Sequence, residues 1–427
     1  MSAVRSQAPA SAGPFFSPLA IRRWWNRKSS PSKPMRAKGA AETAFMPLRS
    51  YMVMPGQPVW MDRSYSQFAQ EAYIRNVVAF RAIGLVSQAA SSVPMYLVQQ
   101  NARGGRRELP GHAAIRLLRR PNPQQGYAEF FEALYKYRLI SGNAFVQAAG
   151  PKDHAPVELY LLRPDRVGVI AGKAAMPAGY RYTVGEVSKD FPVDRITGRS
   201  QVLHLKTFHP MSDWYGLSPV EAAAYSIDQH NQSSAWNQSL LQNGARPSGA
   251  LVVRADVAGG GTLSDDQYSR IKQQMDEQFS GAANAGRPLL LEGGLEWKEM
   301  SLSPQDMDFV QAKHAAARDI ALAFGVPPQL LGIPGDNTYS NLQEARLALW
   351  EQTVLPLVQA TADAVSAWLA PQFGENVQFV PNTDEVMALA LRNQAIWDRV
   401  EKASFLTEDE KRAAVGYGPR TPADAVG

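Results

Sequence analysis

The sequence predicts an α+β fold, from three kinds of pattern. Apolar residues recur near a 3.6-residue period in four long segments, which indicates amphipathic helices at 65–92, 127–139, 304–324 and 341–369, and a capped segment at 218–244 indicates a fifth, more polar helix. Two of these segments open with the same Ser-Pro-x-acid signature of a helix start, at Ser218 and Ser303. Short runs rich in β-branched and aromatic residues between the helices indicate strands.

The region from 65 to 215 contains two helices and most of the strands. Gly142 and Asn143 end the second helix, and short extended runs follow it along the chain. We expect these runs to form one small sheet packed on the helices. They are 144–148, 157–162, 166–170, 180–184 and 202–206.

Two capped helices enclose a compact insert. The first runs from Ser218 to about Gly244, and the second from Ser303 to Phe324. The insert contains a strand at 249–253, a helix at 264–279 and two strands around Gly293-Gly294. It is therefore expected to be a small α/β module carried on two helical legs.

A Pro/Gly loop with a neutral polar tip follows the second leg. Gly325 is suited to a left-handed helix stop, and Ser340 with Gln343 forms a capping box for the next helix. Pro356 is expected to kink that helix. A strand at 376–380, a helix at 386–402 and a short helix opened by Thr407 and Glu410 complete the chain.

Composition excludes several classes of chemistry. The 427 residues include no cysteine, so disulfides, thiolate catalysis and cysteine metal sites are absent. No apolar run reaches the roughly 18 residues needed to span a bilayer, and the amino end lacks a signal-peptide core. We expect a soluble protein made in the cytoplasm, with no membrane association.

The net charge of +5 is unevenly distributed. Residues 1–50 carry nine Lys/Arg and one acid, which leaves 35 basic and 38 acidic side chains, or −3, for residues 51–427. A slightly acidic body argues against a tight, sequence-independent DNA clamp. Residues 1–45 are expected to be a disordered basic arm, which either contacts nucleic acid or an acidic surface or is a solvated tail.

No catalytic, cofactor or metal motif is complete. Ser218 lies in Gly216-Leu217-Ser218-Pro219-Val220, which lacks the second glycine of a nucleophile elbow and suits a helix cap. His204 and His209 lack a third ligand, so structural roles are favoured. We expect a protein that is not an enzyme.

Several short motifs, in this order and spacing, resemble the portal proteins of tailed bacteriophages, in the branch shared by long-tailed phages and gene transfer agents. The resemblance covers about 65–420. It is carried by Arg120-Pro121-Asn122, Gly142-Asn143-Ala144-Phe145, His204, Gly216-Leu217-Ser218-Pro219, Gly244-Ala245-Arg246-Pro247, Phe324-Gly325-Val326-Pro327-Pro328, Leu331-Gly332, Leu355-Pro356, and Leu406-Thr407 with Glu410 and Arg412.

The resemblance implies a portal fold assembled as a ring, usually of twelve subunits, at one capsid vertex. Its parts would be a mixed α/β wing (46–215), a stem helix (216–245), a small α/β clip (246–302), a second stem helix (303–324), a tunnel loop (325–340), a long kinked wing helix with a strand (341–381) and crown helices (382–427). The basic arm (1–45) lies outside the resemblance.

The resemblance also implies partners. Double-stranded DNA would pass through the ring without sequence specificity, driven in by the terminase large subunit and released later. A head-tail adaptor and the major capsid protein would bind the ring. The protein would be part of the virion, assembled in the cytoplasm of a bacterial host.

Three groups of residues are candidates for contacts in such a ring. Asp336, Asn337, Thr338 and Tyr339 would form the loop tip around DNA, unless the loop is only a surface turn. The almost uncharged Gln229, Asn231, Gln232 and Ser233 would line the stem lumen or mediate subunit contacts. Arg270, Lys272, Arg287 and Lys298 would dock motor or adaptor proteins on the clip.

Two alternatives remain from sequence. One is another virion structural protein, such as a minor capsid or head-completion protein. The other is a serine hydrolase that uses Ser218 with His204 or His209.

Overall fold

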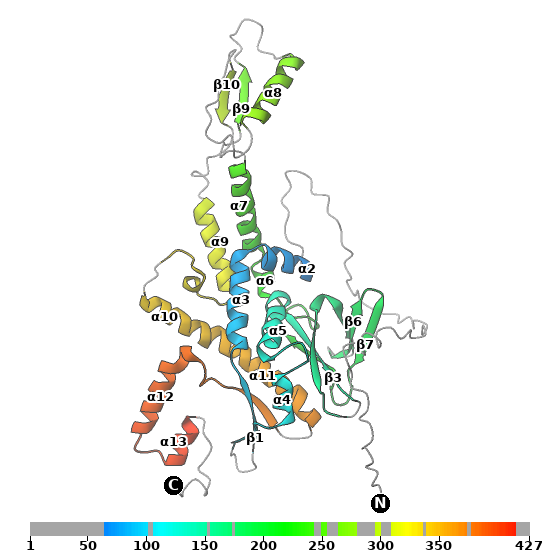
Figure 1. The fold of residues 1–427 in the computed structure, drawn as a ribbon, viewed down its shortest axis with the longest axis vertical. Coiled ribbons are helices and arrows are strands. Elements are labelled where there is room, and N and C mark those ends of the chain that lie inside the picture. The colour runs from blue at the N-terminus through cyan, green and yellow to red at the C-terminus, as the bar shows by residue number, and fades with distance from the viewer. Residues whose placement is uncertain are drawn as a thin grey trace, which may run out of the picture. The chain divides into compact units, whose positions relative to one another are not determined.

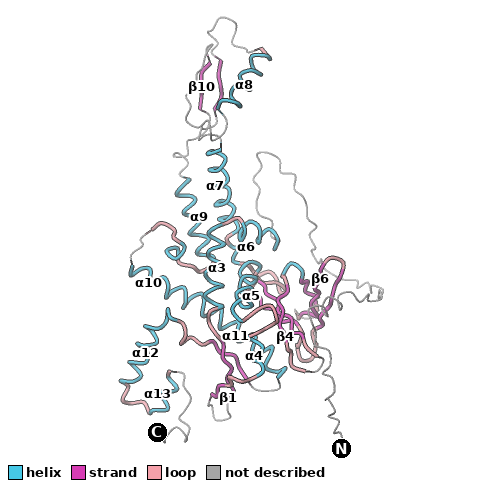
Figure 2. Tube along the Cα trace, viewed as in Figure 1, coloured by secondary structure: helices cyan, strands magenta, loops and turns pink. Residues whose placement is uncertain are grey.

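A computed structural model describes residues 64–100, 106–151, 154–172, 176–242, 249–253, 264–279, 295–299, 309–335, 339–373 and 377–415. The described chain mixes helices with small antiparallel sheets, which confirms the α+β prediction (Figures 1 and 2). The basic arm and Ser303–Asp308, including the second predicted Ser-Pro cap, lie outside the described residues.

The first predicted helix is divided into three parts. A short helix α2 (Tyr65–Gln67) continues as a π-helix η1 (Phe68–Ile74), and α3 (Val77–Ser91) begins after Asn76. Asn76 has extended backbone geometry, and its side-chain oxygen accepts hydrogen bonds from the amides of Val78 and Ala79. The apolar period continues across the break, so periodicity alone missed this N-cap.

Helix α3 packs against α5 (Tyr127–Ser141), which ends at Gly142 with a φ of 73°. A left-handed residue at this position favours glycine, as the sequence predicted. Helix α4 (Ala113–Arg119) joins the same core. Its largest fully buried side chains include Tyr135, Phe130, Phe131 and Ile83.

The prediction of one small sheet is wrong, because the strands form separate sheets. One has the order β4-β3-β8, from Glu158–Leu162, Asn143–Ala149 and Val202–Lys206. A second has the order β5-β6-β7, from Val167–Ala171, Pro177–Val184 and Val187–Pro192. The 3₁₀ turn η2 (Pro164–Arg166) between β4 and β5 redirects the chain from one sheet to the other.

A third sheet pairs a strand from the amino-terminal part of the described chain with a strand from its carboxyl-terminal part. Strand β1 (Met95–Gln100) lies between β2 (Arg106–Glu108) and β11 (Val377–Pro381), and pairs antiparallel with both. Leu97 faces Phe379 in this register, and both side chains are buried. The strands are individually visible in the sequence, but this long-range pairing depends on tertiary packing.

The two helical legs lie side by side, as Figure 1 shows for α7 and α9. The first leg comprises α6 (Pro219–Ala222) and α7 (Ala224–Gln242), with Ser218 as the predicted N-cap. The second is α9 (Phe309–Ala323). The insert contains the antiparallel pair β9 (Gly249–Val253) and β10 (Leu295–Glu299), and helix α8 (Asp265–Phe279).

The long helix after the loop differs from its prediction in two ways. Helix α10 (Tyr339–Ala348) begins before Ser340, so Ser340 is inside the helix and is not its N-cap. A π-helix η5 (Leu349–Val354) then leads into α11 (Leu355–Phe373), with the amide of Leu355 donating to the carbonyl of Trp350. This wider turn directly precedes Pro356, whose ring lacks an amide hydrogen and would crowd a regular helical turn.

The carboxyl-terminal part contains the turn η6 (Met387–Leu389) and helices α12 (Ala390–Lys402) and α13 (Glu408–Ala414). The predicted capping box is confirmed. The Thr407 amide donates to Glu410 Oε2 at 2.8 Å, and the Glu410 amide donates to Thr407 Oγ1 at 3.3 Å.

Candidate functional site: the stem helices and the loop that follows them

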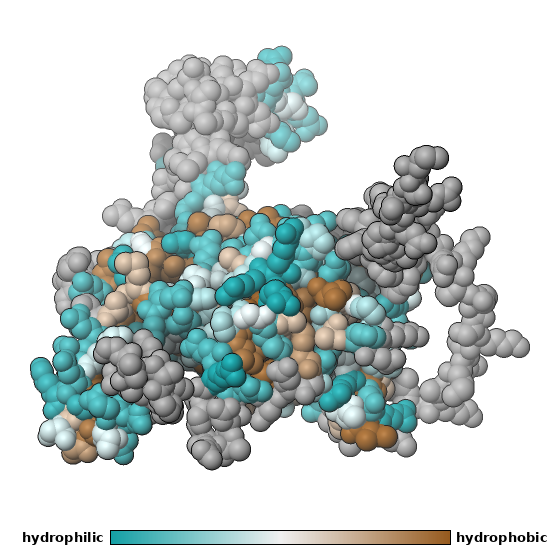
Figure 3. Space-filling view, turned by 60° about the horizontal axis from the view of Figure 1, so that its bottom comes forward, coloured by the Kyte–Doolittle hydropathy of each residue, from teal (hydrophilic) through white to brown (hydrophobic). Residues whose placement is uncertain are grey.

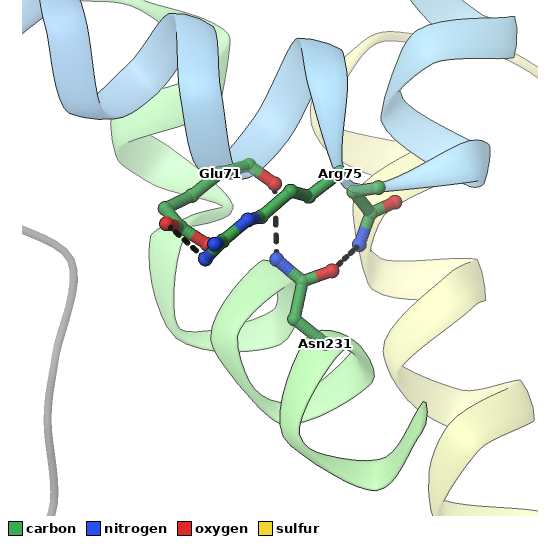
Figure 4. A network of polar contacts seen from close by, with 4 residues as sticks. Glu71, Arg75 and Asn231 are labelled. Atoms are coloured by element: carbon green, nitrogen blue, oxygen red, sulfur yellow. Dashed lines mark hydrogen bonds and ion pairs between the residues drawn. The ribbon is translucent and has the colours of Figure 1, made fainter. Parts of the chain in front are cut away.

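A buried polar network joins α7 to the break between η1 and α3 (Figure 4). The Asn76 side-chain amide donates to Asn231 Oδ1 at 3.0 Å and to His230 Nδ1, 3.2 Å away. Asn231 donates in turn to the carbonyl of Glu71 at 2.9 Å, and Glu71 pairs with Arg75. One face of α7 is thereby fixed to the end of η1 and the start of α3.

His230 belongs to the interior of this junction. Burial lowers the pKa of its imidazole, and the positive charge of Lys313 on α9 acts in the same direction. The Asn76 amide can only donate, so Nδ1 of His230 must accept and carries no hydrogen. A neutral imidazole fits this buried position, where α7 contacts the N-terminal end of α3.

The four predicted lumen residues have different surroundings. Gln229 and Gln232 are exposed, and the hydroxyl of Ser233 donates to the carbonyl of Gln229 within its own helix. Asn231 uses both amide atoms in the junction with Asn76 and Glu71. The lumen role therefore stays a prediction for Gln229, Gln232 and Ser233, whereas Asn231 makes a structural contact within the chain.

The first half of the loop after α9 is tied to both helices that flank it. Gly325 has a φ of 63°, as predicted, and its carbonyl accepts a hydrogen bond from Thr353 Oγ1 at 2.6 Å. The turn η4 (Pro328–Leu331) follows, and Gly332 is also left-handed. Arg318 on α9 donates to the carbonyl of Pro334 at 2.6 Å. The loop thus leaves the stem along a defined path.

The predicted loop tip is only partly described. Asp336, Asn337 and Thr338 lie outside the described residues. Tyr339 is the first residue of α10, so it starts the following helix and does not belong to the loop. The predicted loop boundary at residue 340 is therefore too late by two residues.

The clip candidates are exposed where they are described. Arg270 and Lys272 lie on α8, and Lys298 lies on β10, all with exposed side chains. Arg287 lies outside the described residues. These cations are accessible to an acidic partner, and their docking role stays a prediction.

Ser218 is a cap and has no nucleophile geometry. It is 1% exposed, its hydroxyl lies within hydrogen-bonding distance of the carbonyls of Leu139 and Ile140, and its oxygen accepts from the Val220 amide. The side chain holds α6 against the end of α5. A serine nucleophile needs a general base that accepts the proton of its hydroxyl, whereas the Ser218 hydroxyl contacts backbone groups that hold the helix start in place.

The two histidines of the hydrolase alternative are also engaged elsewhere. His204 Nε2 donates to Asn143 Oδ1 at 2.9 Å, and its ring stacks on Phe145 at a centroid distance of 4.2 Å. Burial, with a smaller contribution from Lys206, lowers the pKa of His204 to about 3. His209 Nδ1 accepts from the Met211 amide. The hydrolase alternative therefore has no support in this geometry.

Sequence reasoning missed the residues that position the stem and the loop. Asn76 carried a usable signal, because asparagine before an apolar helical run is a common N-cap. Arg318 and Thr353 carried none, since each bonds to a backbone carbonyl that is distant in sequence.

Metal sites and membrane-spanning helices can both be assessed in the residues that the structure describes. Among them, no group of three or more His, Asp or Glu side chains is arranged to hold a metal ion. None of the helices in these ranges combines the length and apolarity needed to cross a bilayer.

Comparisons with known proteins agree with this architecture. The family model for phage portal proteins matches residues 77–416. An uncharacterised protein of Rickettsia bellii is 46% identical over 346 residues, covering 81% of this chain and 88% of its own. The portal protein of Enterobacteria phage HK97 is 24% identical, covering 72% of this chain and 70% of its own.

Solved structures give the same result. A chain in the neck of a native gene transfer agent particle, computed with C12 symmetry, is 43% identical with a TM-score of 0.63. The alignment covers 86% of this chain and 96% of that chain. A portal protein of Corynebacterium diphtheriae has the same fold at 17% identity and a TM-score of 0.51. The chain therefore belongs to the phage portal protein family and has a portal, or head-tail connector, function.

Proposed function

We propose that this chain assembles into a closed homo-oligomeric ring in the neck of a virus-like particle and forms the channel through which DNA enters and leaves. The observation that carries the proposal is the 43% identity to a chain of a gene transfer agent neck with C12 symmetry, over 96% of that chain. Head-to-tail contacts that close after a fixed rotation produce such a ring.

The channel is proposed to be formed by α7, α9 and the loop after α9. DNA must slide, and each cation on the wall adds a favourable phosphate contact. Gln229, Gln232 and Ser233 supply polar but uncharged groups. The bonds from Arg318 and Thr353 support a loop of fixed direction, which suits a constriction repeated around a ring.

Asp336 is proposed to place a ring of negative charge at the constriction, which repels phosphate and favours sliding. The matched variants Asp336→Lys and Asp336→Asn separate this effect from simple loss of charge. Lysine should slow packaging strongly and make DNA release salt-dependent, because it adds phosphate contacts, whereas asparagine, which only removes the repulsion, should slow packaging to an intermediate extent. Equal packaging and release by the two variants would contradict the gating role.

The clip is proposed to dock the terminase large subunit during packaging and the head-tail adaptor afterwards. Arg270, Lys272 and Lys298 offer exposed positive charge to acidic surfaces. Reversing all three to glutamate should weaken motor binding at least tenfold while the ring persists. Arg195→Glu, at an exposed position in another part of the chain, is the control. Unchanged motor binding would exclude this docking site.

The ring itself is tested directly by native mass spectrometry and negative-stain imaging of the purified full chain. A closed ring with a central hole is expected, and a monomer at micromolar concentration would contradict the proposal. The structural, non-enzymatic character of the family and the engaged Ser218 hydroxyl support a role without catalysis. The capsid vertex is the proposed location, and the major capsid protein the proposed surrounding partner.

A further inference from the structure

The loop between β8 and α6 displays two large apolar side chains on a fixed backbone. Phe208 is 85% exposed and Met211 is 90% exposed. Isolated exposed apolar residues are common, whereas exposed apolar residues that lie together can mark an interaction surface. We call residues Thr207–Gly216 the apolar knob.

Both ends of the knob are anchored. The Thr207 amide donates to the carbonyl of Gly142 at 3.0 Å, and the Gly216 amide donates to Asn143 Oδ1 at 2.7 Å. A Cβ on Gly216 would lie 2.2 Å from the Gly142 oxygen, so the two strands of the loop base are in backbone contact with the end of α5. The base therefore cannot move away from the wing core.

The interior of the knob is also bonded. The Met211 amide donates to His209 Nδ1 at 3.0 Å, and the Tyr215 amide donates to Ser212 Oγ at 3.1 Å. The Tyr215 hydroxyl accepts from the Val169 amide on β5 at 3.0 Å. With its polar groups used internally, the knob has little freedom to fold Phe208 and Met211 inward.

A second exposed apolar group lies at the junction of η1 and α3. Ile74 is 75% exposed, Val77 is 69% exposed and Phe80 is 51% exposed. Val77 and Phe80 are three residues apart on α3, and the Phe80 ring lies 5.1 Å from Tyr73, the neighbour of Ile74. We call Ile74, Val77 and Phe80 the helix patch.

The two surfaces lie at the same end of the stem. Helix α6, which follows directly on the knob, and η1, which ends at Ile74, both pack against α7 and against each other. Figure 3 shows hydrophobic side chains, in brown, among hydrophilic ones on one face of the molecule. A closed ring relates its copies by rotation alone, so two surfaces that meet must lie at the same height along the axis.

We infer that the apolar knob of one subunit packs on the helix patch of the next, as a heterologous contact that helps to close the ring. This rests on the proposed ring, with its axis along the stem. Such a contact needs two different surfaces on every copy, and the apolar knob and the helix patch are two different exposed apolar surfaces. Burying Phe and Met side chains is favourable, and the contact recurs at every interface.

The absence of cysteine makes cross-linking the sharpest test. The full-length double variant Met211→Cys with Val77→Cys should give a ladder of covalent multimers under mild oxidation, removed by reductant. Each single variant, and the control pair Ile196→Cys with Val77→Cys, should give none. Ile196 is 96% exposed, so the control tests geometry and not accessibility. No ladder from the Met211–Val77 pair, or an equal ladder from the control, would overturn the inference.

A second measurement tests the energetic role. Phe208→Ser with Met211→Ser should raise the subunit concentration for half-maximal ring assembly at least tenfold, while Ile196→Ser leaves it unchanged. Circular dichroism of each variant checks that the subunit remains folded. Rings that form at the wild-type concentration in the knob variant would contradict the inference alone, whereas a wild-type protein that forms no ring would contradict the proposed function.

Discussion

Gly142 and Gly216 are in direct backbone contact, although 74 residues separate them in sequence. A Cβ added to Gly216 would lie 2.2 Å from the oxygen of Gly142, and one added to Gly142 would lie 2.5 Å from the oxygen of Gly216. This contact joins the end of α5 to the segment that leads into the first stem helix. The segment that leads into α6 therefore starts from a fixed point at the end of α5.

Gly216→Ala should destabilise the subunit by about 3 kcal/mol, because the two atoms nearest to an added Cβ, the Gly142 oxygen and the Thr207 amide nitrogen, belong to the backbone and cannot rotate away. Denaturant unfolding at a fixed subunit concentration measures the change. The control is Gly84→Ala in α3, where a Cβ would meet nothing within 4 Å. That variant should be stabilised by roughly 0.5–1 kcal/mol, since alanine is the better helix former. Similar effects at both glycines would contradict the close contact.

Asn76→Ala should cost about 2–3 kcal/mol, because it removes the N-cap of α3 and leaves Asn231 Oδ1 without its buried donor. Asn76→Asp preserves the cap oxygen but not the donor. It should therefore retain helix α3 and lose only the link to α7. Hydrogen exchange separates the two effects, with faster exchange in both α3 and α7 for alanine and in α7 for aspartate. Unchanged exchange in α7 for both variants would mean that the network does not link the helices.

Thr353→Val should cost about 1 kcal/mol by removing the hydroxyl bond to the Gly325 carbonyl at nearly constant volume. Arg318→Met should free the carbonyl of Pro334 and preserve much of the aliphatic contact. Both variants should make the loop after α9 more sensitive to limited proteolysis, and the cleavage sites are located by mass spectrometry. Arg346→Met, at an exposed position on α10, should leave the cleavage pattern unchanged.

His204 should make the subunit less stable as the pH falls below 6.5. Its folded-state pKa is lowered to about 3, so the unfolded chain binds the proton more readily between pH 6.5 and 3. As the pH falls, the contribution of His204 should lower the free energy of unfolding with a slope approaching about 1.4 kcal/mol per pH unit. Above pH 7 the titration of His204 should not affect the free energy of unfolding.

His204→Gln provides the comparison, since glutamine does not titrate. Its unfolding free energy should be lower at pH 7, because the stacking on Phe145 is lost, but should depend less on pH between 6.5 and 5. The comparison is made above pH 5 because most carboxylates are already ionised there and contribute little to the pH dependence of unfolding. Parallel pH profiles for the two proteins would contradict the lowered pKa.

Local sequence signals determined much of this protein. The helix ends at Gly142, Ser218, Gly325 and Thr407 follow from backbone conformation and capping chemistry, which act over a few residues. The order of helices and strands, and the lack of a complete catalytic motif, were also readable from the sequence, and the motifs resembling portal proteins led to the family that the comparisons established.

Tertiary structure alone decided how these elements combine. The pairing of β1 with β11, the separation of the wing strands into different sheets, and the Asn76–His230–Asn231 junction join residues far apart in the chain. Local propensity contains no information about such partners, because burial and hydrogen bonding select them only when the whole chain packs. The apolar knob illustrates the difference. Phe208 and Met211 read as ordinary apolar residues in the sequence, and only the folded chain leaves both exposed on an anchored loop.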